Sequence, residues 1–395
     1  MYLWDLTHLY PSDKEWKIAK EELVKGISAI PVFRGTLGTS AKHLRECLDL
    51  VTNLSKDFAR LSSYAGMSSD QDTRNSSALA MREVISQTGS ELASAASFIE
   101  PEILGIPRTT VEEFLKTEKG LQIYRHYLDD ILRRKDHTGT EGEERIIAEA
   151  GLMAESPHSI YGIFTDAEFP YPGVTLADGR TVRVDKSAFT LQRASTVRED
   201  RAAVFASFFG RLNDYRRTFG TQLNAEVRKN MFYRKARKYP SCLHAALDGN
   251  NIPTEVYHSL IDNVNRHLPT FHRYLSLRQR ILGVDRLHYY DLYAPLLSDI
   301  DLRFRVEEAQ KHILDSLAPL GDEYRAVAQR SFTERWIDMF PTEGKRSGAY
   351  SNGAAYDVHP YMLMNFHGKY DDVSTLTHEL GHTMHSYYSN THQPY

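Results

Sequence analysis

A short run near residue 380 combines residue types that can hold a divalent metal ion and activate water. The segment THELGHTMH at 377–385 contains His378, Glu379 and His382 in the order H-E-x-x-H. On an ideal helix, with about 100° between neighbours, the two histidines lie about 40° apart and share a face. Two imidazoles one turn apart can bind one Zn²⁺ at about 2.0–2.1 Å. Glu379 flanks the pair, so its carboxylate can reach a water on the metal.

This arrangement predicts hydrolytic chemistry. Zinc lowers the pKa of a bound water to about 7 and polarises a scissile carbonyl group. The carboxylate of Glu379 can then accept the proton of that water and pass it to a leaving amine. The alternative is a structural helix whose histidines are merely exposed, because H-E-x-x-H also arises by chance.

The neighbouring residues favour the zinc hypothesis. Apolar residues fall on the side of the helix opposite the histidines, at Val373, Leu376, Leu380, Met384 and Tyr387. Such a helix can bury its apolar side and present imidazoles to a cleft. Asp371 or Asp372 can cap its N-terminus. His385 shares the histidine face, but its spacing favours a hydrogen bond to the site or helix packing over metal ligation.

The segment before this helix has a different composition. The sequence GKRSGAYSNGAAYDVHPYMLMNF is rich in Gly, Ala and Tyr and leads to an expected strand at 361–366. We expect an edge strand that pairs with a substrate backbone, with contacts from Gly348, Ala349, Tyr350 and Gly353. Small residues there would allow a peptide to approach closely. An ordinary turn-rich connection is the alternative.

Elsewhere, helical periodicity dominates. Helices are expected over about 14–30, 40–64, 76–99, 196–237, from 254, 308–317 and 322–332. A hairpin is expected near 174–184, because apolar and polar residues alternate on both sides of Asp178-Gly179.

Composition excludes several classes of protein. The 395 residues include 41% hydrophobic and 25% charged residues, which is typical of a globular protein. With 48 Lys and Arg against 52 Asp and Glu, and no long basic run, neither nucleic acid nor a membrane is an expected partner. Two distant cysteines, Cys47 and Cys242, exclude a disulfide scaffold. The start of the chain has no signal-peptide pattern, so a cytoplasmic location is expected.

The sequence resembles the oligoendopeptidase F branch of the thimet-oligopeptidase-like zinc metallopeptidases. The motifs that carry the resemblance extend over the whole chain and are WDLTHLYPSD, ALDGNNIP, YDLYAPL, GKRSGAYS and YMLMNFHGKYDDVSTLTHELGHTMHSYYS. The resemblance implies His378 and His382 as zinc ligands and Glu379 as general base. It also implies a deep channel that admits short unstructured peptides and excludes folded proteins.

One departure from the family pattern concerns the rest of the site. Family members supply a third zinc ligand, a glutamate on a later helix, and Tyr and His residues that stabilise the oxyanion. No such positions follow in this sequence, which ends at Tyr395. Catalytic zinc sites usually have three protein ligands. We therefore expect an N-terminal portion of a longer enzyme that is inactive alone and needs the missing C-terminal part as a partner.

The expected fold is mainly α, with a multi-helix N-terminal region and an incomplete zincin-like catalytic domain that carries a small β element. The expected domains are 1–110, a helical domain; 111–194, a second helical subdomain with the hairpin; and 195–395, the catalytic domain truncated after the H-E-x-x-H helix. The expected function is a zinc oligoendopeptidase acting on short peptides. The alternatives are a non-catalytic peptide-binding module that keeps the fold and, less well supported, a metzincin. The metzincin pattern requires a His where Tyr388 stands, so it is not matched.

Overall fold

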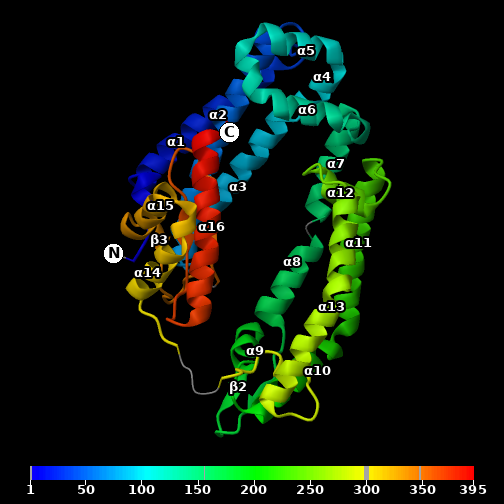
Figure 1. Ribbon diagram of the computed structural model, residues 1–395. Helices are drawn as coiled ribbons and strands as arrows, with labels where there is room; N and C mark the ends of the chain where they lie inside the picture. The colour runs from blue at the N-terminus through cyan, green and yellow to red at the C-terminus, as the bar shows by residue number, and fades with distance from the viewer. Residues whose placement is uncertain (1, 155, 298–301, 347) are drawn as a thin grey trace. The chain divides into compact units, whose positions relative to one another are not determined.

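The computed structural model describes residues 2–154, 156–297, 302–346 and 348–395 (Figure 1). Contacts divide the chain into two compact units. Unit 1 comprises Met1–Lys135 and Leu302–Tyr395, and unit 2 comprises Asp136–Asp301. Unit 1 joins two segments that are distant in sequence, and sequence patterns alone cannot reveal such a grouping. The domain boundaries at 110/111 and 194/195 therefore stay a prediction, differently placed from the two units.

Unit 1 is mainly helical and contains one small sheet. Its helices are α1 (Asp13–Ile27), α2 (Ala41–Gln71), α3 (Ser76–Ala96), α4 (Ile99–Gly105), α5 (Arg108–Thr117), α6 (Arg125–Arg133), α14 (Val306–Ser316), α15 (Asp322–Thr333) and α16 (Tyr370–His392). Its strands are β3 (Ile337–Asp338), β4 (Tyr350–Asn352) and β5 (Tyr361–Leu363). The mainly α fold expected from the sequence is confirmed. β4 and β5 lie within the segment where strands were predicted, whereas β3 was not predicted.

Unit 2 is helical and contains the hairpin. Its elements are α7 (Glu141–Ala154), α8 (Ser156–Ile163), β1 (Gly173–Thr175), β2 (Thr181–Arg183), α9 (Lys186–Gln192), α10 (Arg198–Asp214), α11 (Arg216–Ala236), α12 (Cys242–Asp248) and α13 (Thr254–Leu282). The strands pair antiparallel, and Gly179 adopts a positive φ in the turn, as predicted. The single helix expected over 196–237 is wrong. It is two helices, separated at Tyr215 after Asn213-Asp214, which are poor helix formers.

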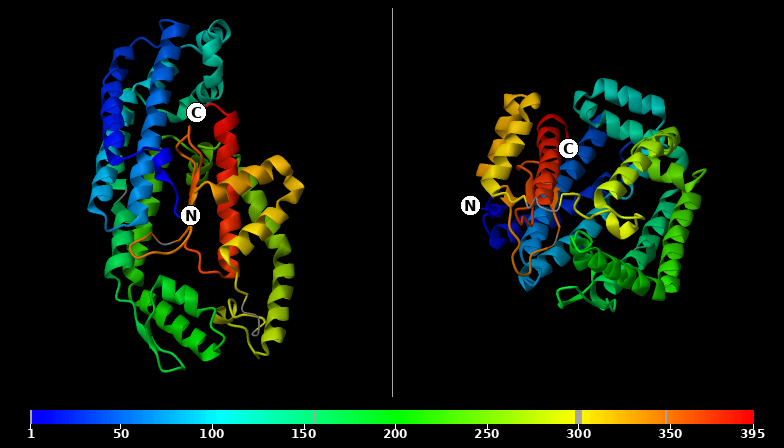
Figure 2. Two further views of the ribbon diagram at one scale, coloured as in Figure 1. Left: turned by 90° about the vertical axis from the view of Figure 1, so that its left-hand side faces the viewer. Right: turned by 60° about the horizontal axis from the view of Figure 1, so that its bottom comes forward.

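The sheet of unit 1 lies between two helical layers. Its strand order is β3-β5-β4, with β3 parallel and β4 antiparallel to β5. Alternate side chains of a strand point to opposite faces. Accordingly Tyr361 and Leu363 pack into the core of the N-terminal helices, whereas Met362 and Met364 pack into the core of α14, α15 and α16. Figure 2 shows the strands between α2 and α16. The sheet therefore joins two cores into one unit.

The first residues of the chain also join these two parts of unit 1. The Asp5 N–H donates to the Arg335 carbonyl group at 2.8 Å, and the Met339 N–H donates to the Tyr2 carbonyl group at 2.9 Å. The Arg335 guanidinium forms an ion pair with Asp5 at 2.7 Å. The N-terminal segment thus pairs with the chain around β3, more than 300 residues later.

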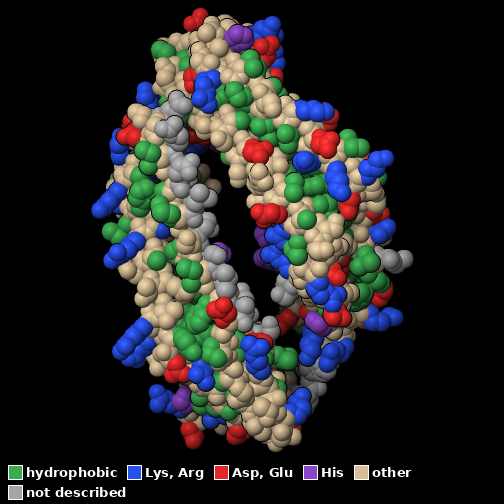
Figure 3. Space-filling view, turned by 180° about the vertical axis from the view of Figure 1, so that it is seen from behind, with side chains coloured by type: hydrophobic (Ala, Val, Ile, Leu, Met, Phe, Trp, Pro, Cys, Tyr) green, Lys and Arg blue, Asp and Glu red, His purple; other side chains and the backbone are tan. Residues whose placement is uncertain are grey.

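Charged and hydrophobic side chains are interspersed on the face shown in Figure 3, and neither charge sign dominates it. This distribution agrees with the balanced composition and with a surface that carries no single-sign field. Among the described residues, none of the helices is both long enough and apolar enough to cross a membrane.

Candidate metal centre

The site begins with the local chemistry that starts α16. Lys369 is the N-terminal capping position, and Asp372 lies one turn into the helix. The Asp372 carboxylate accepts hydrogen bonds from the backbone N–H groups of Lys369 at 2.8 Å and His367 at 3.0 Å. These bonds satisfy donors at the helix start, and the negative charge suits the positive end of the helix dipole. The predicted role of Asp372 at the helix start is confirmed, although it acts from the first turn.

Burial fixes the rotation of α16 about its axis. Leu376, Leu380 and Met384 are at most 1% exposed, and they pack with Met362, Met364 and residues of α14 and α15. Val373 and Tyr387 lie at the margin of the same core. His378 and His382 are on the other side and are exposed. The apolar stripe predicted from periodicity is confirmed, and it forces the two imidazoles outward.

The two imidazoles converge. The Nε2 atoms of His378 and His382 lie 3.1 Å apart, and the ring centroids are 4.8 Å apart. Two nitrogens that ligate one tetrahedral Zn²⁺ at about 2.0–2.1 Å are separated by about 3.3 Å. The observed spacing fits a shared zinc ion with only small adjustment. The donor set, two imidazole nitrogens, also suits zinc.

Glu379 lies beside the pair and is 9% exposed, so it sits at the boundary between the core and the histidine face. One residue past His382, the buried Thr383 hydroxyl lies 2.8 Å from the Ser351 hydroxyl of β4. This bond ties α16 to the edge of the sheet. The carboxylate, the histidine pair and β4 are therefore held by one rigid arrangement of helix and strand.

A complete three-ligand zinc site does not appear in the part of the chain that the structure describes, because no group of three His, Cys, Asp or Glu side chains there is arranged to hold a metal ion. His385 is exposed on α16. The histidine pair supplies two of the three protein ligands that catalytic zinc sites usually have.

β4 is an edge strand of the three-stranded sheet, so its outer side is not paired within that sheet. This is the geometry that β-strand addition of a peptide requires. Gly348 and Ala349 lead into β4. Gly348 is exposed, has a φ of +85°, and has open space where a Cβ would stand. Contacts of these residues with substrate stay a prediction.

The other two predicted contact residues have structural partners. The Tyr350 hydroxyl donates to the Asp70 carboxylate on α2 at 2.9 Å, and burial together with this carboxylate raises its pKa. A Cβ at Gly353 would meet the Ser386 Cβ at 2.3 Å, so close packing of α16 requires glycine there. These contacts account for both residues by packing. Their role in substrate binding stays a prediction.

A buried ion pair shapes the loop that leads to β4. The Lys345 ammonium group lies 2.6 Å from the Asp338 carboxylate, and both side chains are almost fully buried. It also donates to the carbonyl groups of Asp338 and Phe340. Burial lowers the pKa of Lys345, and the Asp338 carboxylate opposes that shift. The pair holds the loop after β3 in the position from which β4 starts.

Unit 1 contains a second pair of histidines, His8 and His359, whose contact the sequence did not predict. His359 Nδ1 lies 2.9 Å from the Pro360 carbonyl oxygen and therefore donates to it, which leaves Nε2 to accept a bond from His8 Nδ1 at 2.8 Å. His359 also stacks on Trp336, with ring centroids 4.5 Å apart. Burial lowers the pKa of His359 to about 4. His359 is therefore neutral at pH 7, and its contacts with His8 and Trp336 stabilise packing.

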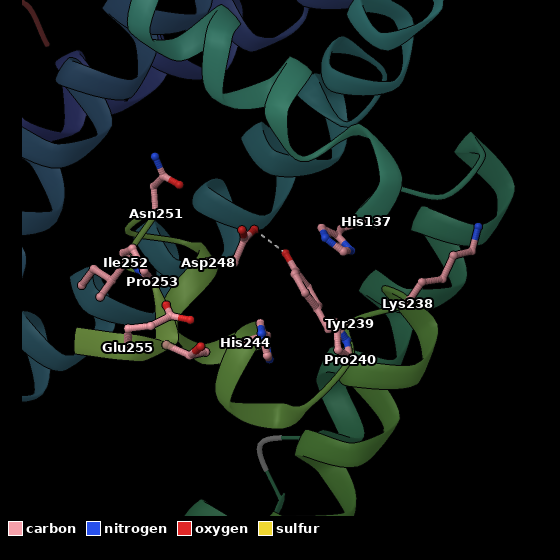
Figure 4. Close-up of a pocket in the computed structure, with 11 residues that line it drawn as sticks. His137, Lys238, Tyr239, Pro240, His244, Asp248, Asn251, Ile252, Pro253 and Glu255 are labelled. Carbon is pink, nitrogen blue, oxygen red and sulfur yellow. Dashed lines mark hydrogen bonds between the residues drawn. The ribbon is translucent and has the colours of Figure 1, made fainter. Parts of the chain in front are cut away.

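Unit 2 contains a recess of about 420 Å³ that sequence reasoning also missed (Figure 4). His137 stacks on Tyr239, with ring centroids 3.8 Å apart, and the Tyr239 hydroxyl donates to Asp248 at 2.5 Å. The recess lies at the start of α13 and includes the GNNIP turn at 249–253. The only signal in the sequence was this turn, which predicts a loop and not a cavity.

Comparisons with known proteins identify the family of this chain. Residues 191–395 match the sequence profile of Peptidase family M3, and residues 102–171 match that of Oligopeptidase F. The chain belongs to peptidase family M3.

Its relatives include Oligopeptidase PepF of Bacillus subtilis, which is 36% identical over 392 residues, and Group B oligopeptidase PepB of Streptococcus agalactiae, which is 34% identical over 394 residues. The matches cover 99% and 100% of this chain, but only 58% and 65% of those relatives. The chain therefore spans about three fifths of the length of the curated relatives it matches.

Solved structures of two related proteins have the same fold. A peptidase from Chlamydophila abortus gives a TM-score of 0.81 at 35% identity, covering 99% of this chain and 66% of that one. Oligoendopeptidase F from Enterococcus faecium gives 0.66 at 30% identity, covering 82% of this chain and 62% of that one. The family resemblance identified from sequence motifs is thereby confirmed.

Proposed function

We propose that this chain is part of a zinc-dependent oligoendopeptidase that hydrolyses internal peptide bonds of short unstructured peptides. The observation that carries the proposal is the 3.1 Å spacing of the His378 and His382 Nε2 atoms on the exposed side of α16. Membership in family M3 supports the class of reaction. The names of the relatives, which are oligopeptidases and oligoendopeptidases, support peptides as the substrate class.

His378 and His382 would hold the zinc ion, which when bound polarises the scissile carbonyl group and acidifies water. Glu379 would accept a proton from the attacking water and deliver it to the leaving nitrogen. The outer edge of β4, with Gly348 and Ala349 before it, would align the substrate backbone. The rigid link between Ser351 and Thr383 would keep that backbone in register with the histidine pair.

Two protein ligands hold zinc more weakly than three, so the proposal includes a further ligand from a region outside this chain. With that region as partner the chain would be active, and without it inactive. A deep channel that selects short peptides and a cytoplasmic location belong to the same proposal. Both cysteines are unpaired, which suits a reducing compartment.

Zinc binding and hydrolysis can be tested separately. Titration calorimetry of the chain should give one zinc per chain, and His378→Ala should remove it. After addition of the unmatched portion of Bacillus subtilis PepF, cleavage of a quenched fluorogenic peptide is expected. Glu379→Gln should keep zinc and lose cleavage by at least 100-fold, whereas the matched control Asp371→Asn on the same helix should keep both. Cleavage that survives Glu379→Gln would contradict the assigned role.

A non-catalytic peptide-binding module is the second candidate. The finding that favours it is the absence of a three-donor metal group among the described residues. This candidate predicts peptide binding by the chain alone, with an affinity that neither zinc nor Glu379→Gln changes. Fluorescence anisotropy of a labelled short peptide, with and without a zinc chelator, separates the two functions.

A further inference from the structure

One helix of unit 2 leaves its apolar side uncovered. Nine large hydrophobic side chains of α13 are between 41% and 61% exposed: Val256, Tyr257, Leu260, Ile261, Val264, Phe271, Tyr274, Leu277 and Ile281. Five of them form what we call the α13 stripe: Tyr257, Leu260, Ile261, Val264 and Phe271. With about 100° between neighbours, these residues fall within an arc of about 100° on the helix. They therefore form one strip along four turns, and the other four exposed hydrophobic residues, Val256, Tyr274, Leu277 and Ile281, lie outside its arc.

The rest of α13 shows that the α13 stripe is not the solvent side of the helix. Its exposed charged residues, Glu255, Asp262, Arg266, Arg273 and Arg280, lie on the side of the helix opposite the stripe. A helix at a protein surface normally turns such a charged side to water and its apolar side to a neighbour. α13 has the pattern of a packed helix but lacks the neighbour along most of its length.

Among the contacts of the residues that the structure describes, buried ones anchor α13 at its C-terminal end. Arg278, which is buried, donates to the carbonyl groups of Asp291 and Ala294. The α13 stripe lies before this anchor. A long isolated helix gains most of its stability from packing of its apolar face, so an uncovered stripe indicates a binding surface.

The chemistry of the stripe defines its partner. Between residues 257 and 271 no charged side chain of α13 lies within the arc of the stripe, so an acidic or basic partner would find no complement there, and nucleic acid is excluded for the same reason. An apolar helical face fits it best. The curated relatives extend beyond the matched region by more than a third of their own length, so their unmatched portion is long enough to supply such a helical face.

We propose that the α13 stripe is the docking surface for an apolar helical segment from the portion of an M3 peptidase that this chain does not span. The inference rests on the proposed function only in taking the partner from that family. Docking would cover the stripe and fix α13 along its whole length. It requires neither zinc nor cleavage of a peptide.

The test fuses this chain to the unmatched portion of Bacillus subtilis PepF and follows hydrogen exchange of the α13 amides. Protection over residues 256–274 should exceed that in the chain alone by at least tenfold. The double substitution Leu260→Glu and Val264→Glu should remove this gain. A control with the same change in net charge, Ser259→Glu with Arg266→Gln on the opposite side, should keep it. Both sets of residues are exposed, and circular dichroism of the unfused variants checks that they fold.

Three results would overturn the proposal. They are unchanged α13 exchange in the fusion, an equal loss in the stripe and control variants, and a dimer of the unfused chain that the stripe substitutions convert to monomers. The last result, measured by light scattering, would assign the stripe to a second copy of the chain. Protection without peptide cleavage would support docking while counting against the proposed enzyme.

Discussion

Helices α16 and α13 have similar patterns of apolar and polar residues, but their apolar sides have different surroundings. The stripe of α16 is buried among α14, α15 and β5, whereas that of α13 is half exposed along most of its length. α16 presents two histidines because its other side is fixed in a core. The comparison shows that periodicity identifies which side of a helix is apolar, but not whether the same chain covers it.

The largest effect on stability should come from Asp291, whose carbonyl group accepts a hydrogen bond from Arg278 near the end of α13. Asp291 is fully buried and forms ion pairs with Arg198 at 2.9 Å and Arg201 at 3.0 Å. Asp291→Asn should reduce the free energy of unfolding by about 3–5 kcal/mol, because Arg201 would keep a buried, unpaired charge. Urea denaturation followed by hydrogen exchange in unit 2 measures this. Asp214→Asn, which breaks an exposed pair with Arg211, should cost less than about 1 kcal/mol.

Acid should affect this anchor only at low pH. Burial alone would raise the pKa of Asp291, but hydrogen bonds from Arg198, the His288 N–H and Arg201 lower it to about 2. A carboxylate with a lowered folded pKa stabilises the protein above its unfolded pKa. That contribution is lost as pH falls from about 4 toward 2.

The covered stripe of α16 comes next. Leu380→Ala should destabilise unit 1 by about 2–5 kcal/mol, because Leu380 is 1% exposed and its removal leaves a cavity. The same substitution should weaken zinc binding by the chain, because the cavity would allow α16 to rotate about its axis and move the two histidines. Thermal unfolding and zinc titration of the same variant test both effects. A cost below about 1 kcal/mol would mean that α16 is not held by this core.

The partly buried imidazole of His359 should make the stability of unit 1 depend on pH. His359 has a folded pKa of about 4, below its usual value of 6.5. The unfolded chain therefore binds more protons between these values, and stability falls by up to about 3 kcal/mol as pH drops from 6.5 to 4. Hydrogen exchange of each unit across this range measures the difference. His359→Phe, which can still stack on Trp336, should remove the slope.

A smaller effect is expected where α16 contacts β4. Gly353→Ala should cost about 1–3 kcal/mol, because the new methyl group would overlap Ser386. The second substitution Ser386→Gly should restore part of this loss, and a double-mutant cycle by chemical denaturation would measure the coupling. An additive double mutant would show that the strain lies elsewhere.

The smallest effect belongs to the uncovered stripe. Leu260→Ala should change the stability of the chain alone by less than about 0.5 kcal/mol, because Leu260 is 61% exposed. Leu380→Ala is its matched counterpart. Equal costs for the two substitutions, measured by urea denaturation, would remove the distinction between the helices.

Local features of the fold were predictable from sequence, and contacts between distant segments were not. The histidine pair and the buried side of α16 follow from helical spacing, and the hairpin follows from Asp178-Gly179. By contrast, Tyr350 faces Asp70 and Gly353 faces Ser386 because of packing between elements, which single-sequence patterns do not encode. Sequence likewise did not reveal that α13 lacks a covering neighbour.

The pairing of the first residues with the chain around β3 has a consequence for synthesis on the ribosome. Tyr2 and Asp5 find their backbone partners only after residue 339 has emerged. Unit 2, residues 136–301, is made in between. At about 5–20 residues per second, this interval lasts about 8–33 s. During that time Tyr2 and Asp5 lack their backbone partners, so chaperones that act on nascent chains have their greatest opportunity to bind the N-terminal segment.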